Sequence, residues 1–178
     1  MTNYLFYFSF FALTFTSWGQ FNLKNVVIVG QFDKPEDRYA IEVNVTEIFS
    51  QLGIKSIPLQ NIIKQGGSAL VLIEDSVQNE LKRKGFDTYV VINVRGYDRT
   101  FKPSTSKERF EEILNRTSIY KLYRDESTSV SFEFIFFRNN EVIFRDILKC
   151  GNISDRDSTI KRFKKKLPKR MKKKWKVY

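Results

Sequence analysis

The sequence predicts an α+β fold, in which a β-α-β-α-β unit forms a mixed sheet and is followed by an antiparallel meander and a C-terminal helix. Two observations lead to this prediction. In the first half of the chain, short apolar runs alternate with helical stripes, and in the second half strand patterns follow one another closely. A chain of 178 residues suffices for one core and is short for two full domains.

The first half alternates strands and helices. Residues 26–29 are a continuous apolar run that ends at Gly30, which predicts a buried strand. Pro35 starts a helix with an apolar stripe on one face, and Gly53 ends it. An extended piece, a second helix and another buried strand are expected at 55–59, 72–84 and 88–94. Helices between strands favour parallel pairing.

The second half is expected to pair antiparallel. Phe side chains alternate onto one face of the segment 130–137, which places Glu133 on the opposite, solvent-facing side. Asn139 and Asn140 suit a tight turn, because Asn tolerates a positive φ. A short helix is expected at 107–114, and three strands are expected at 119–123, 130–137 and 142–148.

A C-terminal helix is predicted from Ser154 or Asp155, either of which can cap its first turn. Its apolar stripe consists of Ile160, Phe163 and Leu167. Pro168 is expected to end or kink this helix. Met171 and Trp175 continue the spacing of four beyond Pro168, which allows a second helical piece.

The N-terminus has the features of a signal peptide. Residues 4–16 are apolar, a length that suits a signal-peptide core better than a membrane span. Ser17 and Gly19 supply small residues at −3 and −1, so the mature chain is expected to begin at Gln20. The pattern resembles signal peptides of Bacteroidetes-type bacteria, although no Lys or Arg precedes the core. An uncleaved anchor and an aromatic first strand are the alternatives.

Three segments follow from these patterns: a signal peptide at 1–19, a single α+β domain at 20–167 and a basic tail at 168–178. We therefore expect an exported protein that is periplasmic or located at the cell surface.

The net positive charge of the chain comes entirely from its C-terminal end. Residues 161–176 hold 11 basic residues and no acidic one, which leaves 20 basic against 20 acidic residues in the rest of the chain. An electrostatic partner is therefore expected there. The residues predicted to bind an anionic surface are Lys164, Lys165, Lys166, Lys169, Arg170, Lys172, Lys173, Lys174 and Trp175. The alternative is a terminal helix that packs on the sheet and ends in a solvated tail.

Several chemistries are excluded by composition. The chain has no histidine, which removes the usual zinc sites and histidine-based catalysis. Its single cysteine, Cys150, cannot form an intramolecular disulfide and is expected to be a buried, inert thiol. No glycine-rich phosphate-binding motif occurs, and we expect no cofactor, no metal and no catalytic residue.

A second candidate site lies in loops that follow the predicted parallel strands. Asp33 follows the first strand, and Arg95, Asp98 and Arg99 follow the third. Ligands tend to bind beyond the carboxyl ends of parallel strands, so these side chains could clamp a carboxylate or phosphate. The alternative is ordinary surface ion pairing.

The order of elements resembles the small α+β domains of envelope proteins of the TolB N-terminal and CsgG type. The residues that carry this resemblance are 26–30, the helix up to Gly53, 85–94 and the hairpin 132–148. The resemblance implies a binding or assembly role in the envelope rather than catalysis.

The resulting expectation is a non-enzymatic envelope protein that attaches through its basic C-terminus to anionic lipid, an acidic glycan or an envelope protein. Such attachment would make it a peripheral membrane protein. Nucleic acid is disfavoured, because no base-stacking motif accompanies the lysines and export is incompatible with it. The alternative function is a carboxylate- and arginine-based hydrolase or transferase at the second candidate site.

Overall fold

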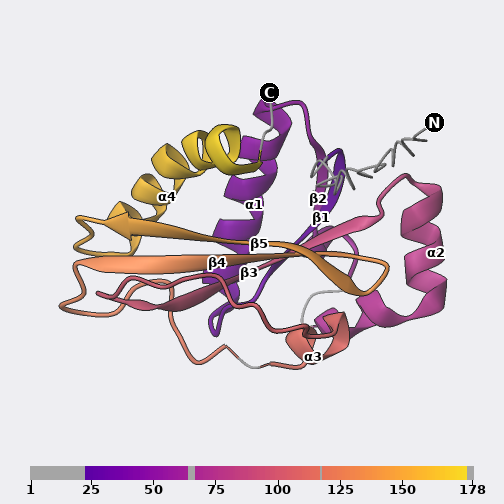
Figure 1. The fold of residues 1–178 in the computed structure, drawn as a ribbon, viewed down its shortest axis with the longest axis horizontal. Helices are drawn as coiled ribbons and strands as arrows, with labels where there is room; N and C mark the ends of the chain where they lie inside the picture. The colour runs from indigo at the N-terminus through magenta and orange to yellow at the C-terminus, as the bar shows by residue number, and fades with distance from the viewer. Residues whose placement is uncertain (1–22, 64–66, 117, 176–178) are drawn as a thin grey trace, which may run out of the picture.

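The computed structural model describes residues 23–63, 67–116 and 118–175, so the predicted signal peptide at 1–19 lies outside the described residues. A five-stranded sheet of order β2-β1-β3-β4-β5 carries helices on both faces (Figure 1). Its strands are β1 (Asn25–Gly30), β2 (Lys55–Pro58), β3 (Thr88–Tyr97), β4 (Ser129–Arg138) and β5 (Glu141–Gly151). The helices are α1 (Pro35–Gln51), α2 (Asp75–Arg83), α3 (Phe110–Leu114) and α4 (Arg156–Arg170). Short helical turns add η1 (Leu59–Asn61), η2 (Ala69–Ile73) and η3 (Met171–Trp175).

The predicted α+β class and strand directions are confirmed. β1 pairs in parallel with β2 and β3, whereas β3, β4 and β5 form an antiparallel meander. Asn139 and Asn140 have φ values of 51° and 63° in the turn between β4 and β5, as their residue type predicts. Gly53 has a φ of 73° just after α1, which is the conformation that ends a helix.

The sheet separates two apolar cores. α1 and α4 cover one face, where Phe132, Phe134 and Phe136 of β4 point. α2, α3 and η2 cover the other, where Ile135 and Phe137 point. Both faces of β4 are therefore buried, as the alternation of its side chains allows.

The prediction of a strand at 119–123 is wrong. These residues form no strand, and their backbone groups bond to distant side chains instead of a ladder. The Leu122 amide donates to Asp37, and the Lys121 carbonyl accepts from Tyr97. Ile119 is 79% exposed, so only Leu122 of this segment is fully buried in the core. The meander is completed by β3, which continues three residues beyond its predicted end.

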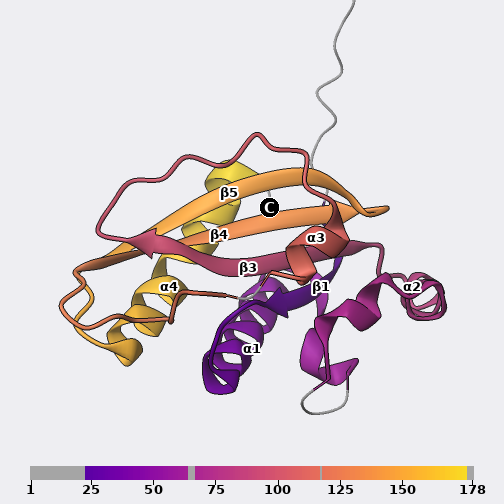
Figure 2. The same cartoon turned by 90° about the horizontal axis from the view of Figure 1, so that it is seen from below.

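The segment between β3 and α3 runs back alongside the sheet (Figure 2). Phe101 of this segment packs on Gly96, where an added Cβ would meet the Phe101 ring at 2.6 Å. The predicted solvent exposure of Glu133 is also wrong, because Glu133 is only 3% exposed. The alternation of side chains along a strand shows which residues share a face. It does not show whether helices cover one face of the sheet or both.

α4 does not end at Pro168. It runs to Arg170 and continues as the π-helical turn η3 up to Trp175. Apolar residues spaced by four drift about 40° per step around an ideal α-helix, so a long stripe would turn away from the sheet. The wider π turn returns Trp175 toward the core, where it is fully buried. The predicted domain boundary at 167 therefore falls inside a continuous helical segment.

Candidate functional site

The C-terminal helical segment, α4 with η3, is fixed on the sheet by one buried stripe. Asp155 caps it by accepting a hydrogen bond from the Ser158 amide at 2.6 Å. The side chains that point into the core recur every four residues: Thr159, Phe163, Leu167, Met171 and Trp175. Each of them is fully buried, and most of the residues on the other sides of the segment are basic.

Lysines occupy the outward side of this segment, which we call the lysine face. Its exposed members are Lys161, Lys164, Lys165, Lys166, Lys169, Lys172, Lys173 and Lys174. The seven lysines that the sequence predicted as surface-binding residues are all among them. None of the five residues of the buried stripe is available on this side. A partly exposed aliphatic side chain, Ile160, lies beside Lys161, Lys164 and Lys165.

Neighbouring elements hold the flanks of the lysine face. Lys164 pairs with Glu47 of α1 at 3.1 Å, and Lys166 donates to the Lys149 carbonyl of β5 at 2.9 Å. The other six lysines of the face form no ion pair with any residue in the described part of the chain. Their charges are uncompensated locally and sit on a rigid element, which produces a fixed region of positive potential.

Arg170 and Trp175, which the sequence placed with the surface-binding lysines, do not belong to the lysine face. Arg170 forms two hydrogen bonds with Asp146 of β5, and the Trp175 indole donates to the same carboxylate at 2.8 Å. The hydrogen bonds that Arg170 donates to Asp146 raise the pKa of its guanidinium. Trp175 also packs against the rings of Phe49, Phe134 and Phe136. Trp175 completes the core, whereas Arg170 is partly exposed and held by Asp146.

The second candidate site is not assembled. Gly30 of β1 lies opposite Ile92, so β3 carries Arg95, Asp98 and Arg99 beyond the strand end that Asp33 follows. Asp98 accepts hydrogen bonds from the Thr128 and Ser129 amides at 2.9 and 2.8 Å. These bonds lower the pKa of the Asp98 carboxyl and give it a structural role beside β4. None of the four predicted residues lines the cavities described below.

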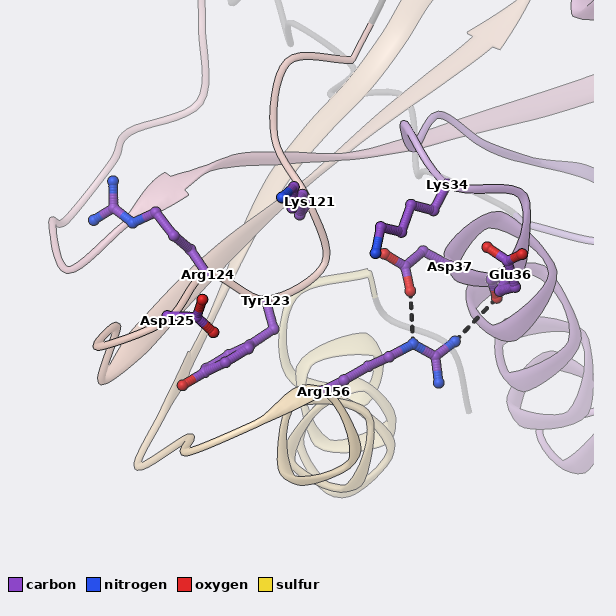
Figure 3. Close-up of a pocket in the computed structure, with 8 residues that line it drawn as sticks. All are labelled: Lys34, Glu36, Asp37, Lys121, Tyr123, Arg124, Asp125 and Arg156. Carbon is purple, nitrogen blue, oxygen red and sulfur yellow. Dashed lines mark hydrogen bonds and ion pairs between the residues drawn. The ribbon is translucent and has the colours of Figure 1, made fainter.

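A polar cavity of about 580 Å³ opens where α1 and α4 begin (Figure 3). Arg156 donates to the buried Asp37 carboxylate at 2.7 Å and to the Glu36 carbonyl at 3.1 Å. The second carboxylate oxygen of Asp37 accepts from the Leu122 amide. The central charges of the cavity thus satisfy one another and tie α1, α4 and the segment 119–123 together.

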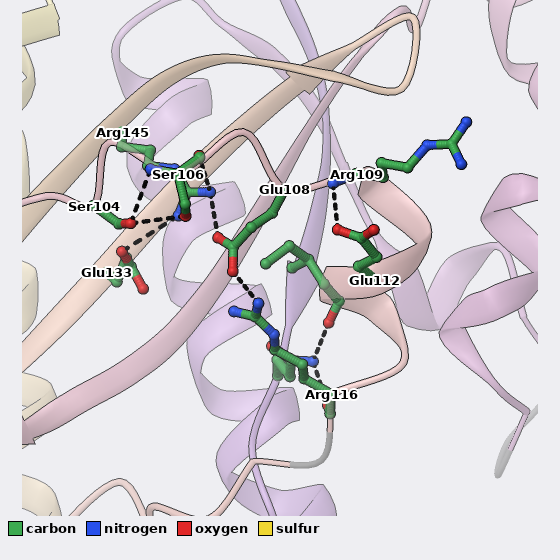
Figure 4. A network of polar contacts seen from close by, with 10 residues as sticks. Ser104, Ser106, Glu108, Arg109, Glu112, Arg116, Glu133 and Arg145 are labelled. Atoms are coloured by element: carbon green, nitrogen blue, oxygen red, sulfur yellow. Dashed lines mark hydrogen bonds and ion pairs between the residues drawn. The ribbon is translucent and has the colours of Figure 1, made fainter.

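A chain of alternating charges lies under the segment that follows β3 (Figure 4). Glu108 accepts from Arg116 and, at 2.5 Å, from Arg145, and Arg145 lies 3.6 Å from Glu133. The side chains of Arg145 and Glu133 are 6% and 5% exposed. A cavity of about 880 Å³ lies beside this network, between residues 103–109 and 139–145. The alternation of charges balances the buried groups and fastens the segment to β5.

Glu42 is a buried carboxyl that sequence patterns did not single out. It is part of α1, and its carboxylate accepts hydrogen bonds from the Gly30 amide at 2.8 Å and the Gln60 amide at 3.3 Å. Burial raises the pKa of Glu42 to about 7, against the opposing effect of these two bonds and of the Arg38 charge. Only the unusual placement of Glu42 between Ile41 and Val45, near the stripe of α1, hints at this in the sequence.

Two negative findings concern the described residues. Residues 23–63, 67–116 and 118–175 contain no helix long and apolar enough to cross a membrane. Within the same ranges, no group of three or more Cys, Asp or Glu side chains is placed to hold a metal ion.

No protein-family model matches the chain, and no curated protein matches it significantly. Solved structures with a similar arrangement include the lipoprotein GNA1162 from Neisseria meningitidis, at 11% identity and a TM-score of 0.46, covering 84% of this chain and 99% of that one. PelC from Paraburkholderia phytofirmans, crystallised as a dodecamer, is similar at 10% identity and a TM-score of 0.41, covering 83% of this chain and 87% of PelC. At this level, the similarities support no inference about what the chain binds.

Proposed function

We propose that the protein is an exported, non-enzymatic envelope protein that attaches to an anionic surface or acidic partner through its lysine face. One observation carries this proposal: among the described residues, six lysines with neither an ion-pair nor a hydrogen-bond partner lie on a helical segment whose opposite side packs in the core. Isolated surface lysines usually alternate with acids, and a single-sign cluster of this density creates a field that attracts anions.

The buried stripe changes how attachment through this face would work. An amphipathic helix that inserts into a membrane needs its apolar side, and here that side packs on the sheet. The lysine face therefore attracts by charge alone. Near an anionic membrane each lysine contributes roughly 1 kcal/mol, so the six unpaired lysines suffice for measurable binding at low salt. The same binding weakens as salt screens the charges.

Cosedimentation with vesicles tests the lysine face. The purified protein is mixed with zwitterionic vesicles and with vesicles containing anionic lipid, at rising salt concentrations. Binding is expected only with anionic vesicles. Replacing Lys165, Lys169 and Lys172 by Gln is expected to reduce it about a hundredfold, since three charges are lost.

The matched control removes the same charge elsewhere. Lys82, Lys102 and Lys107 are exposed and lie outside α4, so replacing them by Gln lowers the net charge equally. If this control variant loses as much binding as the α4 variant, net charge and not the lysine face is responsible. Export is tested separately, by fractionating the native host and determining the N-terminus, which is expected to be Gln20 in a periplasmic or surface fraction.

A further inference from the structure

We propose that the surface bound by the lysine face is a lipid bilayer, and that α1 takes part through Tyr39 and Val43. This inference rests on the proposed function and names its partner. It starts from two exposed apolar side chains that the core does not use: Tyr39 is 59% exposed and Val43 is 38% exposed.

Tyr39 and Val43 lie on the outward side of α1. They are four residues apart, hence adjacent on the helix surface, and opposite the buried side formed by Ile41, Val45 and Ile48. Both α1 and α4 pack on the same face of the sheet, so the outward sides of both helices lie on the side away from the sheet. Figure 1 shows the two helices on this face.

Contacts between the two helices fix them side by side. Arg156 at the start of α4 binds Asp37 at the start of α1, and Lys164 binds Glu47 further along both. Trp175 meets Phe49 at their ends, with ring centroids 6.2 Å apart. α1 and α4 therefore run in the same general direction. Val43 lies one turn before Glu47, the residue of α1 that binds Lys164 of the lysine face, so Tyr39 and Val43 are on the same part of the surface.

The combination of these side chains distinguishes a bilayer from a soluble polyanion. Lysines attract phosphate headgroups, but an acidic polymer in water offers nothing for an exposed Tyr and Val to contact. A Tyr ring prefers the membrane interface, where its apolar body and polar hydroxyl are both satisfied. Lys164 also compensates the Glu47 charge on α1, which reduces repulsion between this part of the helix and anionic headgroups. Glu36 remains exposed on α1 and marks the limit of the patch toward its N-terminus.

A tryptophan reporter tests the contact directly. Tyr39→Trp places a fluorophore on the expected contact, and Asn79→Trp places one on α2, which covers the opposite face of the sheet. Anionic vesicles with lipids brominated in the upper acyl chains are expected to quench Tyr39→Trp and to leave Asn79→Trp unchanged. Wild-type fluorescence is subtracted, and circular dichroism confirms that both variants fold.

A second variant separates apolar contact from charge. Tyr39→Ser combined with Val43→Ser is expected to weaken binding to anionic vesicles about tenfold while leaving the slope of its salt dependence unchanged. Binding of the same variant to polyphosphate is expected to match that of the wild type.

The outcomes distinguish the two proposals. If the wild type binds anionic vesicles but Tyr39→Trp is not quenched, the contact through α1 is wrong and attachment through the lysines stands. If the wild type binds polyphosphate and not vesicles, the bilayer is wrong and the partner is a soluble polyanion. If it binds neither, the proposed function itself fails.

Discussion

The indole N–H of Trp175 and the guanidinium of Arg170 bind the same carboxylate, that of Asp146. Asp146 lies on β5, the edge strand of the sheet, and is 4% exposed. A segment rich enough in lysine to suggest a free tail is thereby fastened at its far end. The lysine face gains its fixed geometry from this contact and from the rings around Trp175.

Trp175 is expected to be essential for stability although it lies in a lysine-rich segment. Trp175→Ala removes a fully buried ring that contacts Phe49, Phe134 and Phe136, and should lower the free energy of unfolding by about 3–5 kcal/mol. Lys172→Ala, in the same turn but exposed, should change it by less than about 0.5 kcal/mol. Urea denaturation measures both. Equal stabilities of the two variants would contradict the placement of Trp175.

Glu42 is expected to make stability depend on pH. Burial raises its pKa from 4.5 to about 7, so the folded state holds a proton that the unfolded state releases between these values. The stabilisation that comes from protonating Glu42 is therefore fully present below pH 4.5 and is lost as the pH rises to about 7. Above that pH, Glu42 no longer makes stability depend on pH. Its total size is on the order of 3 kcal/mol.

Denaturation of wild type and Glu42→Gln across this pH range measures the effect. The variant cannot titrate at position 42, so its stability should exceed that of the wild type increasingly from pH 5 to 7. Glu47→Gln, an exposed change on the same helix, serves as the control and should follow the wild-type curve. Parallel curves for all three proteins would show that Glu42 is ionised in the folded state across the whole range.

Arg145 is expected to be the critical member of the charge network. Arg145→Met leaves Glu133 buried without a cation and should cost about 3–5 kcal/mol. Adding Glu133→Gln should restore part of this loss, because the uncompensated charge is then gone. Arg116 is the other partner of Glu108, and its side chain is half exposed. Arg116→Met should therefore lower the free energy of unfolding by about 1 kcal/mol or less. A double-mutant cycle by urea denaturation tests this order, and additive losses at 145 and 133 would refute the coupling.

The Cys150 thiol is expected to react only when the protein opens. It is fully buried, and burial raises its pKa to about 12, so the thiolate that reacts with disulfide reagents is absent at neutral pH. Labelling with an aromatic disulfide should be complete at once in denaturant and slow in native buffer. An Asn79→Cys variant, whose added thiol is exposed, should react rapidly at one of its two cysteines. Fast labelling of native wild type would disprove the buried position.

The sequence predicted those parts of the fold that depend on local patterns. The alternating Phe residues of β4, the turn at Asn139 and Asn140, and Gly53 after α1 each have a local physical cause, and each prediction was right. The strand prediction for 119–123 failed because these residues have the pattern of a strand, while their backbone groups form hydrogen bonds with the distant side chains of Asp37 and Tyr97. A local pattern does not contain such partners.

The candidate site was predictable in its charges and not in its apolar residues. Lysines are exposed wherever a helix packs, since burying them costs too much, so the lysine face followed from composition. Whether Trp175 enters a membrane or the core depends on a cavity built by Phe49, Phe134 and Phe136, which only the folded sheet reveals. Tyr39 and Val43 stand out only once the buried side of α1 is known.

The stripe that ends in Trp175 also sets when the protein can fold. Phe49, on the first helix, has no ring among the described residues to pack against until residue 175 has been synthesised, and Phe134, in the centre of the sheet, lacks one of its ring contacts until then. The growing chain is therefore expected to stay open, with its apolar surface unpaired, through most of its translation. An open chain is the form that a translocation channel accepts. If the chain is exported as proposed, late closure of the core leaves it time to cross before it becomes compact.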